Sequence, residues 1–400
     1  MTYLAVRENT QLTRKQKGVM ISHRNVIANV LQIKAYEDPH RKKLIEPGNQ
    51  SDYIENVLGL LPLSHIYALI VIAHLSVYRG DGVIILPKFE FKTYLEAIQT
   101  HKIQTLFLVP PILILMTKSG DIMKSYDLSC VKAIFTGAAP LGEETAEDLQ
   151  KLFPSWAIRQ GYGLTETSTV VCTTSPEDIW FGSSGSLLPA IEARLMTIEG
   201  TEITGYDQPG ELWVKGPAVT LGYKGNDKAT KETFVDGFMR TGDEAVVKKN
   251  PKTGYEHIFI VDRLKELIKV KVCSSFHPPC RISLTSMLQG LQVAPAELEA
   301  VLLSHPSVAD CVVIGVPSDR EGEVPKAFVV KSPSVGLEES DRMVARDIAR
   351  HVEKNKARHK WLKGGIEFID VVPKSPSGKI LRRLIRDKEK EKRRAQGAKL

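Results

Sequence analysis

The segment QGYGLTET, residues 160–167, is the most informative stretch of the sequence, and three further motifs follow it in order. These are RTGD at residues 240–243, VDRLK at residues 261–265 and PKSPSGK at residues 373–379. A glycine-rich strand end with Thr and Glu can hold phosphate oxygens and a magnesium ion, a later Asp can bind ribose hydroxyls, and a late Lys can meet developing negative charge. Each string alone is typical of a surface turn. Together they predict a nucleotide-binding site.

The chain pattern predicts an α/β fold. Amphipathic segments such as residues 143–152 alternate with short β-branched runs, as crossover helices alternate with strands, and these runs are residues 57–63, 82–86, 104–109 and 132–135. Residues 182–243 are strand-rich with Gly and Pro at the turns, which predicts a smaller β subdomain. Beyond Arg263 the pattern predicts a compact α+β unit, with helices at 295–303 and 341–356 and strands at 309–316 and 327–330.

Taken with this pattern, the motifs resemble those of the adenylate-forming (AMP-binding) superfamily, and most closely the 4-coumarate:CoA ligase-like branch of acyl-CoA synthetases. The resemblance spans residues 17–390. It implies a large N-terminal domain of α/β sheet layers with a β subdomain, and a small mobile α+β C-terminal domain. It also implies an ATP-dependent acid–CoA ligase, which forms an acyl-adenylate from an aryl or medium- to long-chain acid and then the CoA thioester. ATP, Mg²⁺ and coenzyme A are the implied cofactors.

The resemblance assigns roles residue by residue. For the nucleotide it implies Lys17 and Thr165 on phosphate, Glu166 as the magnesium ligand, Tyr162 on adenine, Asp243 on ribose and Arg263 on ribose and phosphate. Lys379 is the residue expected to carry adenylation, with Lys269 as a second active-site lysine. The remaining implied nucleotide and CoA positions are Gly137, Ala138, Ala139, Gln160, Gly161, Gly163, Lys265, Lys88, Gly290 and Gln292. The acyl group is expected against His65, Tyr67, Val71 and Thr173. A core histidine remains the alternative for His65.

Two segments depart from the family pattern. Residues 9–16 (NTQLTRKQ) stand where the family has a Ser/Thr/Gly-rich phosphate loop, and no glycine is present there to wrap phosphate with backbone N–H groups. Relatives also carry a long segment ahead of this point, so we expect an N-terminally truncated chain or a wrong first exon. Removing residues 272–289 joins LKELIKVK to GLQVAPAELE and restores an unbroken hairpin. These residues are interpreted as a translated intron, because they show no helical or strand period and because codons for Val272 and Gln289 can supply the usual intron ends GT and AG. A metal site at Cys273, His277 and Cys280 is the weaker alternative, since only three candidate ligands are present and their spacing matches no common closed zinc site.

The expected domains are therefore residues 1–262, the AMP-binding domain truncated at its start; residues 263–390, the C-terminal domain with the 272–289 insert; and residues 391–400, a basic tail. Residues 374–400 carry eleven Lys and Arg against three Asp and Glu, so this end holds more than the whole net charge of +7. A mixed-sign helix end in solvent is expected there, with no nucleic-acid partner.

Targeting and membrane signals are sparse. No apolar run approaches the roughly 20 residues that span a bilayer, so no transmembrane segment is expected. The five cysteines favour a reducing compartment over a disulfide framework. The final Ala398-Lys399-Leu400 matches the loose form of the peroxisomal address, so we expect an import receptor as partner and the peroxisome as location, with the cytoplasm otherwise.

Two alternative functions stay open at the level of sequence. One is an adenylation domain that loads a carrier protein, although no carrier-like segment follows residue 390. The other is an inactive truncated pseudoenzyme that binds nucleotide or a partner without turnover. Nucleotide binding compared with pyrophosphate exchange separates a ligase from the inactive alternative.

Overall fold

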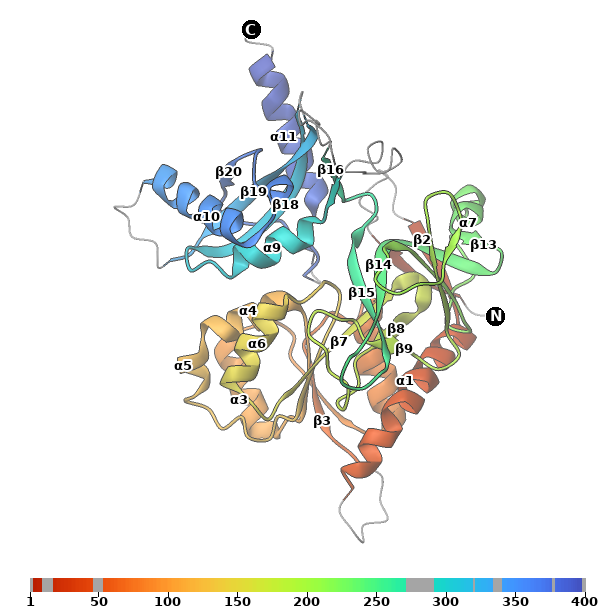
Figure 1. The fold of residues 1–400 in the computed structure, drawn as a ribbon. Helices are drawn as coiled ribbons and strands as arrows, with labels where there is room; N and C mark the ends of the chain where they lie inside the picture. Colours follow the sequence, from red (N-terminus) through yellow and green to blue (C-terminus); the bar gives the residue numbers. More distant parts are fainter. Residues whose placement is uncertain are drawn as a thin grey trace. The chain divides into compact units, whose positions relative to one another are not determined.

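The computed structural model describes residues 3–8, 17–45, 53–270, 291–318, 321–333, 340–375 and 378–397, with residues 3–8 and 396–397 as backbone only. The chain divides into two compact units. The first comprises residues 1–260 with 376–379, and the second comprises residues 261–375 with 380–400 (Figure 1). The residues 9–16, 272–289, Gly290 and 398–400 singled out in the sequence lie outside the described residues.

The first unit is built on a seven-stranded sheet in the order β4-β3-β5-β6-β7-β8-β9. Neighbours from β4 to β7 are parallel, whereas β8 and β9 are antiparallel. The strands are β3 (Asn56–Gly59), β4 (Gly82–Ile85), β5 (Thr105–Leu108), β6 (Ala133–Thr136), β7 (Ala157–Leu164), β8 (Thr169–Thr173) and β9 (Ser186–Leu187). Each predicted β-branched run overlaps one of these strands, which confirms the α/β class.

Helices cover both faces of this sheet. Along β5, Leu106 and Leu108 point into one apolar cluster and Phe107 into another, because successive strand side chains alternate between faces. One face packs against α1 (His23–Lys43) and the π-helical η1 (Ala68–Ser76), which continues into α2 (Val77–Arg79). The other packs against α3 (Phe91–His101), α4 (Pro110–Lys118), α5 (Gly120–Met123) and α6 (Glu143–Leu152). The predicted helix at residues 143–152 coincides with α6.

Helix α1 is fixed to the sheet by buried ion pairs. The Glu37 carboxylate lies 2.8 Å from an Arg79 guanidinium nitrogen and 2.7 Å from one of Arg159, and all three side chains are at most 12% exposed. Burial alone would raise the pKa of Glu37, but the two guanidinium groups outweigh it and lower that pKa to about 2. Because Arg159 lies on β7 directly before Gln160, this contact ties α1 to the strand that carries the decisive motif.

The predicted β subdomain is a second, antiparallel sheet in the first unit. Its order is β11-β10-β12-β14-β13, with β15 paired to β14. The strands are β10 (Glu192–Met196), β11 (Glu202–Ile203), β12 (Gly210–Lys215), β13 (Phe234–Val235), β14 (Phe238–Lys249) and β15 (Glu256–Arg263), and helix α7 (Asp227–Thr233) precedes β13. A two-stranded ribbon of β1 (Tyr3–Glu8) and β2 (Lys17–Ser22) completes this unit.

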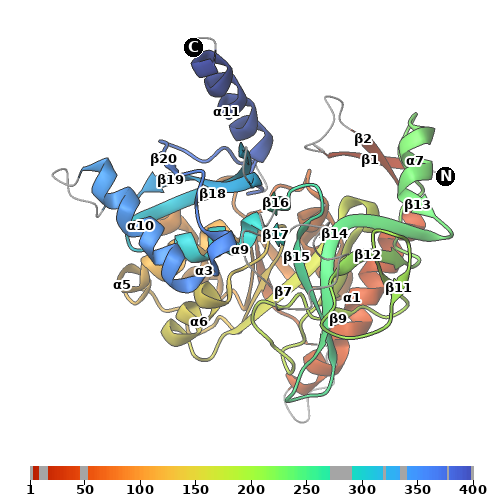
Figure 2. The same cartoon turned by 45° about the horizontal axis from the view of Figure 1, so that its top comes forward.

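The second unit is a compact α+β fold, as the sequence predicted (Figure 2). Its sheet has the order β17-β16-β19-β18, and β20 pairs with β19 in parallel. The strands are β16 (Ile268–Val270), β17 (Leu291–Val293), β18 (Val308–Ser318), β19 (Gly322–Lys331) and β20 (Ile366–Phe368). The helices are α9 (Pro295–Leu303), α10 (Asp341–Asn355), η3 (Arg358–Lys360) and α11 (Arg382–Gly397). Proline at the first position of α9 fits a helix start, where its missing N–H costs nothing.

The basic C-terminal segment is a helix with a solvent-exposed end, as the sequence predicted, because residues 390–395 are all exposed. Residues 391–397 continue α11, and basic side chains of this helix pair with acidic residues of the same unit. Arg382 contacts Glu299 and Arg386 contacts the buried Glu266, and Glu389 lies 2.7 Å from Lys326. The first turns of the helix are therefore anchored to the sheet.

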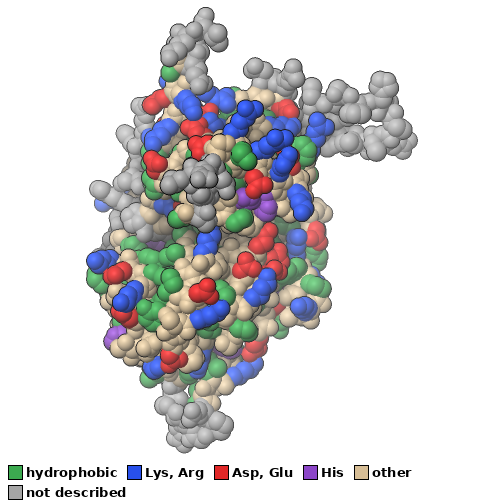
Figure 3. Space-filling model, turned by 90° about the vertical axis from the view of Figure 1, so that its left-hand side faces the viewer, with side chains coloured by type: hydrophobic (Ala, Val, Ile, Leu, Met, Phe, Trp, Pro, Cys, Tyr) green, Lys and Arg blue, Asp and Glu red, His purple; other side chains and the backbone are tan. Residues whose placement is uncertain are grey.

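Surface charge is mixed rather than segregated on the face drawn in Figure 3, where Lys and Arg side chains are interspersed with Asp and Glu. Within the described residues, no helix is both long and apolar enough to cross a bilayer. Cys130, Cys172 and Cys311 are free thiols, and the last two are buried.

Candidate active site

The motif at residues 160–167 forms a tight turn between two sheet strands. Its first half completes β7, and Thr165–Thr167 then form one turn of 3-10 helix before β8 returns antiparallel. A Cβ added to Gly163 would lie 1.4 Å from the Thr169 carbonyl oxygen, and one added to Gly161 would lie 2.7 Å from the Phe135 ring. Thr169 itself has a φ of 112°, which is unusual for a β-branched residue. Glycine at both positions is therefore required by close packing.

The loop that follows β6 lies beside this turn. Gly137 is buried, and a Cβ placed on it would lie 3.4 Å from the Gly161 carbonyl oxygen. Ala138 is exposed and has a φ of 71°, a left-handed conformation. The Gln160 side-chain oxygen accepts a hydrogen bond from the Leu141 backbone N–H at 3.1 Å. Gln160 thus holds the loop containing Gly137, Ala138 and Ala139 against β7, at the carboxyl ends of parallel strands where open α/β sheets bind ligands.

Tyr162 and Asp243 meet next to that loop. The Tyr162 hydroxyl donates a hydrogen bond to Asp243 Oδ2 at 2.6 Å. Asp243 is only 4% exposed, and its backbone N–H bonds to the Thr241 hydroxyl at 3.1 Å. Burial and the neighbouring carboxylate raise the pKa of the Tyr162 phenol, so this group stays a donor at neutral pH. The structure therefore brings together the residues predicted for adenine and ribose.

Glu166, Thr165 and Lys17 form the phosphate side of the candidate site. Thr165 and Glu166 are buried, and the Tyr223 hydroxyl donates to Glu166 Oε1 at 2.6 Å. The Lys17 ammonium lies 4.3 Å from the centre of the Tyr223 ring. No sequence motif marks Tyr223, since an isolated tyrosine after a Gly-Pro-rich turn is typical of structural packing.

The donor chemistry at this point fits magnesium. A buried carboxylate beside a buried hydroxyl presents hard oxygen ligands, and Mg²⁺ typically takes one or two carboxylates together with substrate phosphates. In the described ranges, no group of three His, Cys, Asp or Glu side chains is placed to hold a metal by itself. Glu166 would hold the ion, with nucleotide oxygens supplying further ligands.

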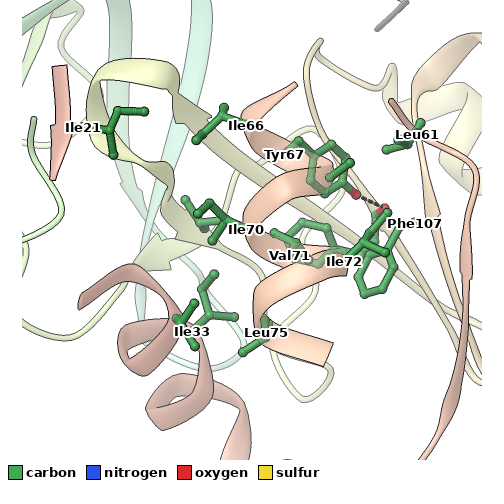
Figure 4. Close-up of a cluster of buried hydrophobic side chains, with 14 of the residues drawn as sticks. Ile21, Ile33, Leu61, Ile66, Tyr67, Ile70, Val71, Ile72, Leu75 and Phe107 are labelled. Atoms are coloured by element: carbon green, nitrogen blue, oxygen red, sulfur yellow. Dashed lines mark hydrogen bonds between the residues drawn. The ribbon is translucent and has the colours of Figure 1, made fainter. Parts of the chain in front are cut away.

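Two of the predicted acyl-binding residues, Tyr67 and Val71, belong to the apolar cluster between α1, η1 and the sheet (Figure 4). The Tyr67 hydroxyl donates to the Phe135 carbonyl oxygen at 2.7 Å, and its ring contacts Phe107 and Phe135. Val71 is 2% exposed and points from η1 into this cluster, whereas His65 is half-buried. The Thr173 hydroxyl donates to the Gln160 carbonyl oxygen at 3.2 Å. Tyr67, Val71 and Thr173 are thus buried, and His65 Nδ1 accepts a hydrogen bond from the Tyr67 backbone N–H at 3.3 Å.

Lys269 and Gln292 lie directly opposite each other in the antiparallel pair of β16 and β17. Lys269 is exposed and Gln292 half-buried. Opposed residues of such a pair share a face of the sheet, so both side chains project from the same side. The pairing predicted to be interrupted by the 272–289 insert is therefore present in the structure.

The other predicted residues are distributed as follows. Arg263 ends β15, and its carbonyl oxygen accepts hydrogen bonds from the backbone N–H groups of Glu266 and Leu267. Lys265 and Lys88 are exposed. Lys379 is half-buried in a loop closed by a bridge between Lys374 and Ile380, where Gly378 adopts a φ of 83°.

The sheet order and the grouping of the predicted site residues around one turn fit a nucleotide-binding enzyme, and the chain belongs to the AMP-binding enzyme family. The family model of the AMP-binding enzyme matches residues 13–224, and the model of its C-terminal domain matches residues 297–379. The chain is similar to the acyl-CoA ligase lcsD of Purpureocillium lilacinum, with 45% identity over 370 residues that cover 92% of this chain and 88% of that protein.

Two further comparisons agree with this assignment. The probable 4-coumarate–CoA ligase 1 of Dictyostelium discoideum is 39% identical over 93% of this chain and 60% of its own length. MatB of Rhodopseudomonas palustris, solved with bound ATP, superposes with a TM-score of 0.77 at 24% identity, over 96% of this chain and 67% of that chain, which shows the fold. The chain spans 54% to 60% of the length of seven further curated acyl-CoA or 4-coumarate–CoA ligases.

Proposed function

We propose that this chain carries the active site of an ATP-dependent acid–CoA ligase. The observation that carries the proposal is the grouping around one turn: Tyr162 bonded to Asp243 on the nucleoside side, and Glu166 and Lys17 joined through Tyr223 on the phosphate side. Four of these five residues were named from sequence motifs that lie far apart in the chain. The names of the relatives, acyl-CoA ligase and 4-coumarate–CoA ligase, support the same reaction.

The proposed chemistry has two steps. A carboxylate oxygen of the acid attacks the α-phosphorus of ATP, the bond to the bridging oxygen breaks, and pyrophosphate leaves with its electron pair. The sulfur of coenzyme A, after losing its proton, then attacks the acyl carbon and expels AMP. Lys17 and the Thr165 hydroxyl would bind phosphate oxygens, and Asp243 would accept both ribose hydroxyls. Magnesium held at Glu166 would neutralise phosphate charge.

Three residues from the C-terminal part of the chain are proposed to act in different steps. Lys379 would donate hydrogen bonds to the carboxylate and phosphate as charge develops during adenylation. Lys269 and Gln292, which share one face of a hairpin, would serve thioester formation. Arg263 and Lys265, at the start of the second unit, would support the nucleotide.

The acid is proposed to bind through apolar contact. Tyr67 and Val71 are buried among Ile and Phe side chains, so the wall they form excludes water and offers few polar partners to a substrate. An aryl or a medium- to long-chain acyl group fits this chemistry better than a short polar acid.

We also propose peroxisomal import through Ala398-Lys399-Leu400, tested by fusing residues 374–400 to a fluorescent protein and deleting the tripeptide.

Acid-dependent exchange of labelled pyrophosphate into ATP tests the main proposal. A panel of aliphatic and aryl acids is incubated with the chain, ATP and Mg²⁺, and thioester is then measured after adding coenzyme A. Exchange stimulated by at least one acid is expected. AMP binding without exchange for any acid would show instead that the chain binds nucleotide without turnover.

A further inference from the structure

Tyr223 contacts both charged groups of the phosphate side. Its hydroxyl donates to Glu166 Oε1 at 2.6 Å, and the Lys17 ammonium lies 4.3 Å from the centre of its ring. The tyrosine is 5% exposed, so both contacts form where water is largely excluded. A hydrogen bond to a carboxylate and a cation over an aromatic face both gain strength in such surroundings.

The backbone around Tyr223 is fixed from both sides. The Met20 N–H bonds to the Gly222 carbonyl at 2.9 Å, and the Lys224 N–H bonds to the Gly18 carbonyl at 2.8 Å. An antiparallel bridge between Val19 and Tyr223 lies between these bonds. The segment carrying Tyr223 therefore pairs directly with the strand that carries Lys17.

The same segment is also bonded to Glu166 and to helix α1. The Thr220 N–H donates to the Glu166 carbonyl oxygen at 2.9 Å. The Asn25 side-chain amide donates to the carbonyl oxygens of Pro217 and Val219 at 2.9 and 2.8 Å. The Tyr223 N–H bonds to the Thr230 hydroxyl at 2.9 Å. Because these bonds hold the backbone of Tyr223 in one position, its ring has a defined place between Lys17 and Glu166.

We propose that Tyr223 is a positioning residue that sets the separation of the proposed metal ligand Glu166 from the proposed phosphate-binding Lys17. The ring is rigid, so an ammonium over its face and a carboxylate at its hydroxyl are held at a fixed spacing. The hydroxyl also orients one oxygen of Glu166, which determines how the carboxylate is presented to a cation. This inference rests on the proposed function, because it assigns a partner to two residues of the same site.

The test is the effect of a divalent cation on ATP affinity, measured by isothermal titration calorimetry on the full chain. Tyr223→Phe removes the hydroxyl and keeps the ring over which Lys17 lies. Affinity for ATP without a divalent ion is expected to change less than about 2-fold, since the ring contact survives. The gain in affinity on adding Mg²⁺, and binding of Mn²⁺ followed by its paramagnetic resonance signal in the presence of ATP, are expected to fall about 10-fold.

Two further variants complete the comparison. Tyr223→Leu removes ring and hydroxyl together and is expected to weaken ATP binding with and without the metal. Tyr94→Phe is the matched control, because Tyr94 is fully buried in another cluster and its hydroxyl has no hydrogen-bond partner within the described part of the chain. Its ATP affinity and metal response are expected to equal those of the wild type. If the phenylalanine variant does not fold, the ratio of metal-supported to metal-free ATP affinity is compared between Tyr223→Leu and the wild type, and an unchanged ratio overturns the proposal.

The outcomes separate this inference from the proposed function. Equal metal responses of wild type and Tyr223→Phe overturn the positioning role, whatever acids the wild type activates. A Tyr223-dependent metal response in a chain that forms no adenylate with any acid upholds the positioning role and overturns the ligase assignment. A loss of metal-free and metal-supported affinity in equal proportion in Tyr223→Phe would show general distortion and would also overturn the proposal.

Discussion

Replacing Glu37 with Gln is expected to destabilise the first unit strongly and in a pH-dependent way. The carboxylate lies between the guanidinium groups of Arg79 and Arg159, at 2.8 and 2.7 Å, with little solvent exposure on any of the three. The substitution keeps the shape but leaves two buried cations without their anion. Removing one partner from a buried ion pair costs about 3–5 kcal/mol.

The pH dependence gives an independent magnitude. The pKa of Glu37 is lowered from 4.5 to about 2, against the effect of burial, by the Arg159 and Arg79 charges. At 1.36 kcal/mol per pKa unit, this shift corresponds to roughly 3 kcal/mol of stability. Because the pKa of Glu37 is lower in the folded than in the unfolded chain, its contribution to stability is fully present at pH values above the unfolded pKa, that is above about pH 5. The contribution is lost as the pH falls toward 2.

Urea unfolding followed by tryptophan fluorescence measures both effects. Trp156, Trp180 and Trp213 lie in the first unit and Trp361 in the second, so the signal reports mainly the unit that contains Glu37. Wild type should lose stability between pH 5 and pH 2 more steeply than Glu37→Gln, whose curve lacks this contribution. Glu177→Gln, which breaks an exposed pair with Lys43, is the control and should leave the midpoint unchanged at pH 7. A loss below 1 kcal/mol for Glu37→Gln at pH 7, or parallel pH curves, would refute the reasoning.

Three further outcomes are expected in the site. Lys379→Ala should abolish acid-dependent pyrophosphate exchange while a supplied acyl-adenylate is still converted to thioester; equal loss of both reactions would contradict its role. Asp243→Asn should weaken AMP binding about 10-fold in calorimetry, because a charge-assisted hydrogen bond becomes a neutral one, and unchanged affinity would exclude the ribose contact. Gly163→Ala should lower exchange at least 100-fold, because a Cβ 1.4 Å from the Thr169 carbonyl forces the turn apart. Gly205→Ala, whose Cβ meets only the flexible end of Gln208, should behave as wild type.

The sequence predicted the sheet of the first unit well because its strands are short, apolar and β-branched, and they are separated by amphipathic helices. Helices α6 and α9 begin and end where the pattern placed them, since α6 has a clear amphipathic period and α9 starts at a proline. The predicted strand at residues 57–63 proved too long, because β3 ends at Gly59 before a turn containing Pro62. Patterns of neighbouring residues therefore sufficed to predict the helices and strands that such residues determine by themselves.

What the sequence did not indicate are the contacts that join distant segments. Glu37 reads as one acidic residue on a polar helix, and only folding places it between Arg79 and Arg159. Tyr223 carries no motif, yet it touches two residues that motifs had marked. The first turns of the basic C-terminal helix pair with Glu266 and Glu299, which lie far away in the sequence, so these ion pairs were not indicated. Each contact that the sequence did not indicate joins residues that are far apart in the chain.

The pairing of β16 with β17 aligns Lys269 with Gln292, and this alignment depends little on the length of the segment that connects the two strands. Lys269 and Gln292 are aligned by strand register, and residues 271–290, which stand between the two strands in the sequence, lie outside the described residues. Each doubling of a linking peptide costs only about 0.6 kcal/mol of closure entropy. Transcripts with and without residues 272–289 are therefore expected to encode chains that align the same pair of side chains.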